Sequence, residues 1–270
     1  MKILFIGAGK MGLSIISAWS KSHKNTFLNI HVVEKNLSTI NKIKKNKKKI
    51  SISRKVPSNW TGELVLFAIK PQDFSKISNE ILKNKIKFKN IISIMAGVTI
   101  KKICNDLRTN VAVARVMPNL AVKLNLGVSC IYYPVKTKMP FRKKVNSLFN
   151  ILGNTYNMKN EKLLETVTAI SGSGPAYLFL FIQVFERIAC DLGFSKIESK
   201  KIVYDTIEGA FELVKKENNT ISLIKSVSSK KGTTEAAIQI LENKNTGLYK
   251  LLSGAINAAK NRANELSQIK

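Results

Sequence analysis

Short apolar runs separated by longer polar stretches fill the first half of the chain. The runs are rich in Val and Ile and alternate little, which is typical of strands buried on both faces of a sheet. The polar stretches between them leave room for crossover helices, so we expect a parallel sheet with helices on both sides. The expected strands are ILFIG (3–7), IHVVE (30–34), ELVLFAI (63–69), NIISIM (90–95), VAVARV (111–116) and GVSCIYY (127–133).

The pattern changes after about residue 158, where apolar residues recur at helical spacing and strand-like runs disappear. We therefore predict an α/β domain over 1–158 and an all-helical domain over 159–270. The stretch 176–190 is apolar on nearly every face, so its side chains need apolar neighbours on more than one side. Those neighbours belong either to its own domain or to a partner subunit, and we favour the partner.

The chain of 270 residues carries 45 Lys and Arg against 17 Asp and Glu, a net charge of +28. The lysines are spread over the whole length, and the densest cluster, 41–49, contains no aromatic residue that could stack on bases. We interpret that cluster as a solvated helix face and expect no nucleic-acid partner.

Cysteines and leader-like segments indicate the compartment. Cys104, Cys130 and Cys190 are dispersed and form neither a disulfide framework nor a metal-binding pattern. Only ILFI precedes the first glycines, which is too short for a secretory leader, and the longest apolar run, 176–182, is too short to span a bilayer. We expect a reduced, cytoplasmic protein with no membrane partner.

A glycine-rich segment, GAGKMG, directly follows the first expected strand and opens a helix near Lys10. Gly7 permits the tight turn, Gly9 lets the backbone approach a pyrophosphate, and Gly12 allows close packing of helix on strand. This context favours dinucleotide binding over a glycine-rich turn without a ligand. The candidate coenzyme residues here are Ile6, Gly7, Ala8, Gly9, Lys10, Met11 and Gly12.

The end of the second expected strand bears on the choice between NADH and NADPH. Glu34 favours NADH because an acid accepts from the ribose 2′-OH and repels a 2′-phosphate. Lys35 and Asn36 follow it and suit a phosphate if Glu34 turns to solvent. Both coenzymes stay open. Two further segments end strands of the same sheet and supply the candidates Ala68, Ile69, Lys70, Pro71, Ala96 and Gly97.

Two segments of the second half precede helices. SGSGPAY (171–177) offers Ser173 as a cap and Pro175 for a first helical turn. In SVSSKKGTTEAAIQILE (226–242), free amides at a helix start favour a carboxylate ligand, although a plain capping box accounts for the same residues.

Taken in order, these segments resemble pyrroline-5-carboxylate reductase over nearly the whole chain. The resemblance implies a Rossmann domain followed by a helical domain that dimerises by interlocking helices, often with dimers gathered into larger rings. It also implies reduction of 1-pyrroline-5-carboxylate to L-proline, the last step of proline biosynthesis, by NAD(P)H, more often NADPH. The motifs are GAGKMG, AIKPQ (68–72), SIMAGV (93–98), RVMPN (115–119), SGSGPAY and VSSKKGTTEAAI (227–238).

The resemblance also assigns residues to the substrate. Thr234 matches the family's substrate-contacting threonine, and we expect its hydroxyl to donate to the imine nitrogen. Amides of Ser229, Gly232, Thr233 and Thr234 are expected to hold the carboxylate. Val227 and the turn at 117–119 are candidates for lining the ring pocket.

The last motif departs from the family's usual SPGGTT or SPGGAT, because Lys230 and Lys231 replace the proline and the first glycine. If that glycine has a positive φ in relatives, Lys231 is strained by about 1 kcal/mol or more. Our hypothesis is that the loop is retained and that its lysines strengthen attraction for the substrate carboxylate. Two alternatives remain, another two-domain dehydrogenase of the 3-hydroxyacid type and a non-catalytic nucleotide sensor.

Overall fold

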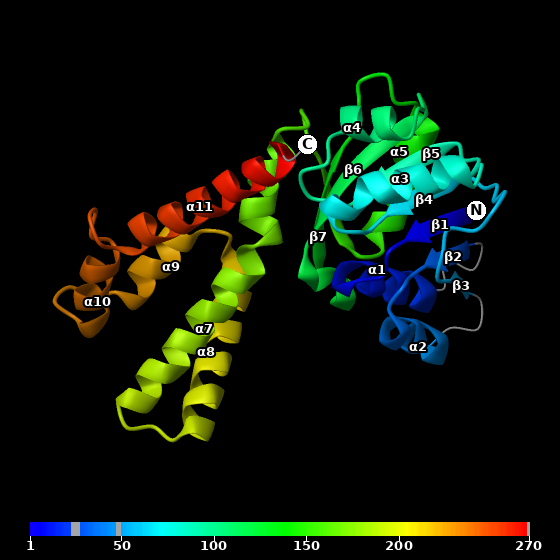
Figure 1. Ribbon diagram of the computed structural model, residues 1–270. Coiled ribbons are helices and arrows are strands. Elements are labelled where there is room, and N and C mark those ends of the chain that lie inside the picture. Colours follow the sequence, from blue (N-terminus) through cyan, green and yellow to red (C-terminus); the bar gives the residue numbers. More distant parts are fainter. Residues whose placement is uncertain (23–27, 47–49, 269–270) are drawn as a thin grey trace. The chain divides into compact units, whose positions relative to one another are not determined.

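The computed structural model of the chain describes residues 1–22, 28–46 and 50–268 (Figure 1). It divides into two compact units. The sheet unit comprises Met1–Ser173 and the chain end from Ala259, and the helical unit comprises Gly174–Ala258. The domain division expected between residues 158 and 159 stays a prediction.

Among the described residues, eight strands form one sheet in the order β3-β2-β1-β4-β5-β6-β7-β8. The chain crosses from β1 to β2 on one side and to β4 on the other, so the direction of strand order reverses between β1 and β4, as in a Rossmann fold. The strands are β1 (Lys2–Ile6), β2 (Asn29–Val33), β3 (Ile50–Ser53), β4 (Leu64–Phe67), β5 (Asn90–Ser93), β6 (Ala112–Pro118), β7 (Gly127–Tyr132) and β8 (Gly153–Asn157).

The sheet is parallel, as expected, except at one place, where β6 and β7 pair antiparallel, with Val116 opposite Ile131. Only the 3₁₀ turn η3 (Leu120–Leu124) connects them, and a parallel pair needs a longer crossover. β7 and β8 pair parallel again through α5 (Met139–Asn150). The other strand pairs are parallel, as expected.

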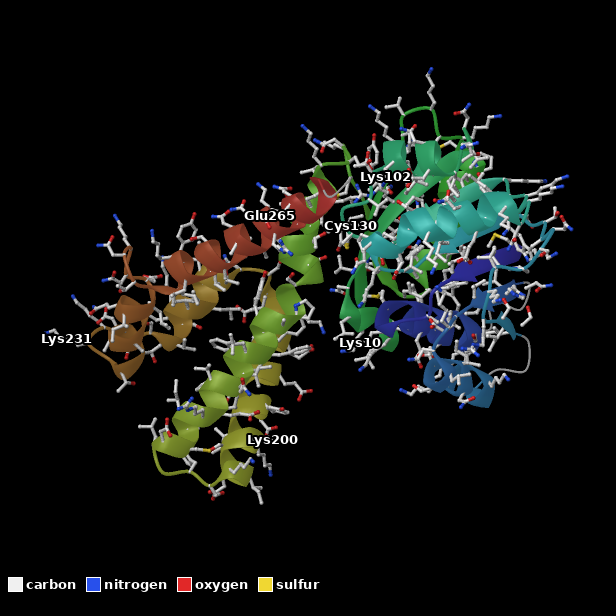
Figure 2. The ribbon with its side chains drawn as sticks, viewed as in Figure 1. Lys10, Lys102, Cys130, Lys200, Lys231 and Glu265 are labelled. Atoms are coloured by element: carbon white, nitrogen blue, oxygen red, sulfur yellow. The ribbon has the colours of Figure 1, made fainter. Side chains whose placement is uncertain are left out.

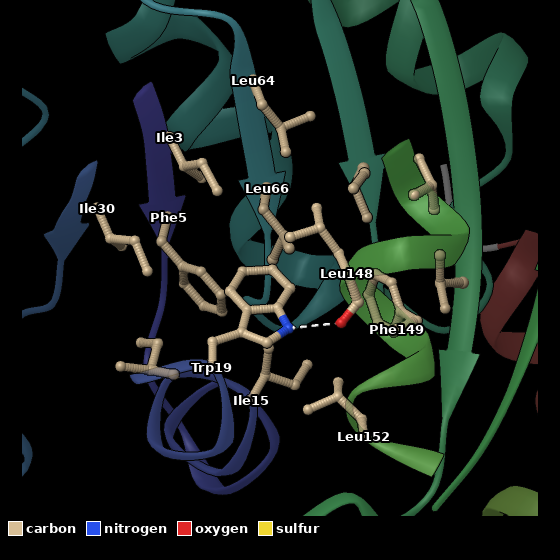
Figure 3. Close-up of a cluster of buried hydrophobic side chains, with 14 of the residues drawn as sticks. Ile3, Phe5, Ile15, Trp19, Ile30, Leu64, Leu66, Leu148, Phe149 and Leu152 are labelled. Carbon is tan, nitrogen blue, oxygen red and sulfur yellow. Dashed lines mark hydrogen bonds between the residues drawn. The ribbon is translucent and has the colours of Figure 1, made fainter. Parts of the chain in front are cut away.

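Helices cover both faces of the sheet. One face packs against α1 (Lys10–Lys21), α2 (Leu37–Asn46) and α5, and the other against α3 (Phe74–Lys83) and α4 (Ile100–Asp106). Trp19 lies at the centre of the first face (Figure 3), edge-on to Phe5 and Phe149, with its indole N–H donating to the Leu148 carbonyl at 2.8 Å. This contact joins α1 to α5.

A buried arginine marks the second half of the sheet. Arg115 on β6 is 1% exposed and pairs with Glu161 at 2.9 Å and with Glu165 at 3.4 Å. Glu161 also accepts the backbone N–H of Ile100 at 2.8 Å, at the start of α4. Glu165 lies in α6 (Leu163–Val167), so one guanidinium ties β6 to the segment that follows β8.

The remaining chain is helical, as the sequence predicts. α6 continues through a π-helical turn, η4 (Thr168–Gly172), into α7 (Gly174–Asp191), and α7 packs against α8. The last helices are α8 (Lys196–Glu217), α9 (Thr220–Val227), α10 (Thr233–Leu241) and α11 (Leu248–Gln268).

The helix α7 exposes most of its large apolar side chains within the single chain. Leu178, Phe181 and Phe185 are 65%, 53% and 39% exposed. By length and composition alone, the continuous helical stretch Leu163–Asp191 is apolar enough to cross a membrane, because the helix extends on both sides of the short run in the sequence. The described helical unit therefore leaves this surface uncovered.

Candidate functional site

The loop between β1 and α1 has the geometry that the glycine motif predicts. Gly7 has a φ of 87°, and a Cβ there would lie 2.6 Å from Ile69 Cγ2. A Cβ on Gly12 would lie 2.6 Å from the Gly7 carbonyl oxygen, so α1 approaches the loop closely. A Cβ on Gly9 would meet nothing within 4 Å, which leaves open space beside the backbone where a pyrophosphate would lie.

A cavity of about 320 Å³ opens at the carboxyl ends of β1, β2 and β4. It lies where the strand order reverses, the usual place for ligands in open α/β sheets. It brings together eight of the predicted coenzyme residues, namely Ile6, Gly7, Gly9, Glu34, Lys35, Ala68, Ile69 and Lys70. Asp73 and Lys76 also line it, although the sequence analysis did not single them out. The loop and the cavity thus fit a dinucleotide.

The other predicted coenzyme residues do not line this cavity. Ala8 and Gly12 are buried in the loop and the first turn of α1, Met11 packs on the core, and Lys10 is exposed at the start of α1 (Figure 2). Pro71 opens a short 3₁₀ turn before α3, and Asn36 caps the segment that leads into α2. Ala96 and Gly97 form the turn after β5, where Gly97 has a φ of 73°.

Glu34 uses both carboxylate oxygens within the protein. One accepts the backbone N–H of Ala8 at 2.6 Å and the other that of Asn36 at 2.8 Å. The half-buried carboxylate therefore ties the glycine loop of β1 to the end of β2 rather than pointing into solvent.

The predicted substrate residues lie together around the start of α10. Val227 ends α9 and is 65% exposed, Ser229 lies in the connecting loop, and Gly232 is the N-cap of α10. A Cβ on Gly232 would lie 2.4 Å from Ser229 Oγ and 3.0 Å from the Ser229 carbonyl oxygen, so the loop packs closely against this residue. Thr233 and Thr234 form the first turn, whose N–H groups have no intrahelical acceptor.

Two other amides of this loop are already bonded. The Gly232 N–H donates to the Ser229 carbonyl at 2.9 Å, and the Lys231 N–H donates to the Glu235 carboxylate at 2.5 Å. Glu235 thus reaches back beyond the N-cap, much as the acid of a capping box does. The first-turn amides of Thr233 and Thr234 are the groups of this loop that an anion would meet.

Lys231 has a φ of 60°, so the strained left-handed conformation considered from the sequence is the one that the loop adopts. A residue with a Cβ is destabilised by roughly 1–2 kcal/mol in the left-handed conformation, whereas glycine adopts it without this cost.

We expect Lys231→Gly to raise the free energy of unfolding by about 1 kcal/mol, because glycine adopts this φ without strain. Urea unfolding at fixed protein concentration measures it. Lys231→Ala is the matched control, since it removes the charge but keeps the Cβ. An equal gain in both variants would show that the charge, and not the backbone, is responsible.

The segment 117–119 lies in the sheet unit, where Met117 and Pro118 are the last residues of β6 and only Asn119 follows the strand. Met117, Pro118 and Asn119 are buried, and the Asn119 side-chain oxygen accepts the Val128 N–H at 3.1 Å. In the segment 171–177, α7 begins at Gly174, with Pro175 in its first turn. The hydroxyl of Ser171 is buried without a hydrogen-bond partner. No contact assigns a ligand to either segment.

The cysteines are free thiols. Burial raises the pKa of the Cys104 and Cys130 thiols above the usual range, so both disfavour the reactive thiolate. Within the described ranges, no group of three or more His, Cys, Asp and Glu residues could hold a metal ion.

Comparisons with known proteins cover both parts of the chain. Residues 161–266 match the family model described as pyrroline-5-carboxylate reductase dimerisation, and residues 2–97 match NADP oxidoreductase coenzyme F420-dependent. The pyrroline-5-carboxylate reductase of Aquifex aeolicus is 34% identical, over 98% of this chain and 97% of that protein.

Solved structures give the same result. A pyrroline-5-carboxylate reductase from Coxiella burnetii is 28% identical, with a TM-score of 0.83 over 98% of each chain. The Plasmodium falciparum pyrroline carboxylate reductase, solved with NADP bound, is 24% identical, with a TM-score of 0.82 over 99% of this chain and 98% of that one, and shows a shared fold.

The alternatives from the sequence are not favoured by these relatives, which match the chain from end to end. The dimerisation model also spans the exposed apolar helix α7. The chain belongs to the pyrroline-5-carboxylate reductase family.

Proposed function

We propose that the chain reduces 1-pyrroline-5-carboxylate to L-proline with NAD(P)H, and that Thr234 and the loop before α10 hold the substrate. One observation supports the assignment of the substrate site: α10 begins at Thr233 and Thr234, directly after the N-cap Gly232, so the free amides of its first turn belong to these two threonines. Such a helix start suits a small carboxylate.

The coenzyme site is proposed at the carboxyl ends of β1, β2 and β4. The glycine loop and the amino end of α1 would hold the pyrophosphate, because backbone N–H groups and the helix dipole both favour negative charge. Ala68, Ile69 and Lys70 line the same cavity from the end of β4. When bound, the reduced coenzyme supplies the hydride for the imine carbon.

Thr234 is proposed to orient the imine nitrogen. A threonine hydroxyl is too weak an acid to protonate an amine-like nitrogen alone, so solvent delivers the proton and Thr234 donates a hydrogen bond that fixes the ring. The first-turn amides of Thr233 and Thr234 hold the carboxylate, and Ser229 and Val227 flank it.

An enzyme assay tests the proposed reaction. Purified protein is mixed with 1-pyrroline-5-carboxylate and either NADPH or NADH, and the loss of coenzyme absorbance is compared with proline formed. We expect one proline for each coenzyme oxidised. Coenzyme binding without proline formation would instead support the nucleotide-sensor alternative.

The two lysines of the substrate loop are proposed to attract the substrate carboxylate. Reverting Lys230 and Lys231 to Pro-Gly should raise the Michaelis constant for the substrate about twofold to fivefold at low salt, because exposed charge pairs contribute up to about 1 kcal/mol. The difference should shrink at high salt. Lys244→Ala, an exposed lysine beyond α10, is the control. An unchanged constant at low salt would remove this role.

The family's assembly is proposed for this chain as well. The exposed apolar side chains of α7 support a homodimer, with larger rings of dimers as the next level. The expected location is the cytoplasm. Light scattering after size-exclusion chromatography measures the mass, and a protein of 30.1 kDa in solution would contradict the dimer.

A further inference from the structure

Two motifs of the sequence, and the helix that leads into a third, meet in a small apolar cluster of the sheet unit. Met117 and Leu164 are buried there, and Ala96 and Val167 pack against them. Ala96 belongs to SIMAGV in the turn after β5, and Met117 belongs to RVMPN at the end of β6. Leu164 and Val167 lie on α6, which continues through η4 into SGSGPAY. Segments far apart in the sequence therefore pack together.

One ion network joins the same segments. Oε1 of Glu161 accepts a hydrogen bond from Arg115 on β6 at 2.9 Å and another from the backbone N–H of Ile100 at 2.8 Å. Ile100 begins α4, shortly after the turn at 96–97, and Arg115 also pairs with Glu165 of α6 at 3.4 Å. The Arg115 side chain is only 2% exposed, so water cannot readily replace Glu161 as its partner. Glu161 therefore anchors the chain that follows the turn at 96–97 to β6.

The turn at 96–97 lies where the second half of a dinucleotide would extend. The coenzyme cavity is at the carboxyl ends of β1, β2 and β4, and β5 and β6 run parallel to β4, so their carboxyl ends are at the same edge of the sheet. A Rossmann sheet binds a dinucleotide across the point where strand order reverses, with the adenosine half toward β2. The nicotinamide half would then lie over β4, β5 and β6, beside Ala96 and Gly97.

We infer that Glu161 is a positioning residue for hydride transfer, because it holds the turn at 96–97 against which the nicotinamide ring would lie. The inference rests on the proposed function, since that ring is the hydride source of the proposed reaction. Glu161 acts through the Ile100 N–H and the buried Arg115, which together fix the backbone that follows the turn. Hydride transfer needs the reacting carbons about 3–3.5 Å apart, and a displacement of about 1 Å costs about 100-fold. A small shift of this turn would therefore slow the reaction.

Glu161→Ala removes the acceptor and tests the inference. Calorimetry uses a coenzyme that lacks the ring, ADP-ribose for NADH or 2′-phospho-ADP-ribose for NADPH, and its stoichiometry counts the folded coenzyme sites. This ligand should bind the variant within about twofold of the parent protein, whereas turnover per site at saturating substrate should fall about tenfold or more. Unchanged turnover per site would overturn the inference, and so would an affinity for the ringless ligand that falls by the same factor as turnover.

Two further variants locate the effect. Glu161→Gln keeps an oxygen that can accept the Ile100 N–H, so its turnover per site should stay within about threefold of the parent's. A loss as large as in Glu161→Ala would contradict the positioning role, because it would assign the effect to the charge. Glu63→Ala is the matched control, since Glu63 also pairs with a cation, Lys144, at 2.9 Å, but precedes β4 at the opposite edge of the sheet. It should leave turnover per site within about twofold.

Binding of the whole coenzyme separates this inference from the proposed reaction. Compared with the ringless ligand, the reduced coenzyme should lose about threefold or more in affinity for Glu161→Ala, because only the ring meets the turn at 96–97. If the parent protein forms no proline and this selective loss is found, the reaction alone is contradicted. If the parent forms proline and Glu161→Ala forms it at the same rate per site, the inference alone is contradicted. Neither proline nor a selective loss would contradict both.

Discussion

Thr234→Ala should lower the turnover number for 1-pyrroline-5-carboxylate about 100-fold, because removal of a positioned hydrogen-bond donor at the reacting group costs about 10²-fold or more. The threonine lies in the first turn of α10, where its hydroxyl is the group proposed to orient the imine nitrogen. Steady-state kinetics at saturating substrate and coenzyme measure the effect.

Two variants control this result. Thr234→Ser keeps a hydroxyl and should recover most of the activity, and Thr233→Ala removes the neighbouring hydroxyl while keeping the backbone amides. Adenosine 2′,5′-bisphosphate should bind the Thr234 variant as it binds the parent protein. Turnover at the parent level in Thr234→Ala would contradict the assignment.

Arg115→Met should lower the free energy of unfolding by about 3–5 kcal/mol, since removing one partner of a buried ion pair leaves an uncompensated charge. The Glu165 side chain is 11% exposed, and one of its oxygens already lacks a partner, so it cannot regain water easily. Urea unfolding at fixed protein concentration gives the change.

Lys144→Met is the control for Arg115, because it breaks an ion pair with Glu63 whose side chains are 41% and 39% exposed. Exposed pairs contribute about 1 kcal/mol or less. Adding Glu165→Gln to Arg115→Met should restore part of the stability by removing the stranded charge. A loss in Arg115→Met no larger than in the control would show that the buried network is not stabilising.

The strands that the sequence predicts are those buried on both faces. LVLF of β4 is wholly buried, and its lack of alternation follows from helices on either side. β3 and β8 were missed because they are edge strands with the polar sequences ISIS and GNTYN, which carry little hydrophobic signal. The direction of β7 depends on a short connection and not on its own residues.

The candidate site was predictable where the backbone imposes a residue type. Glycine is required at Gly7 by its φ and at Gly12 by close packing, so the motif can be recognised without a structure. The sequence could not show that the Glu34 carboxylate accepts a hydrogen bond from the Ala8 N–H, because that contact depends on the folded position of the glycine loop. The cavity lined by Arg54 and Lys55 lies after β3, a strand that the sequence did not indicate. The short alternation of ISIS was the available signal.

In the proposed dimer, the apolar surface of α7 couples folding to association. A chain released at high dilution would keep Phe181 and Phe185 in water, so the isolated subunit would be poorly stable and prone to aggregate. Mass action then sets the thermal midpoint, which should rise as the protein is concentrated. Newly made subunits would depend on meeting one another quickly.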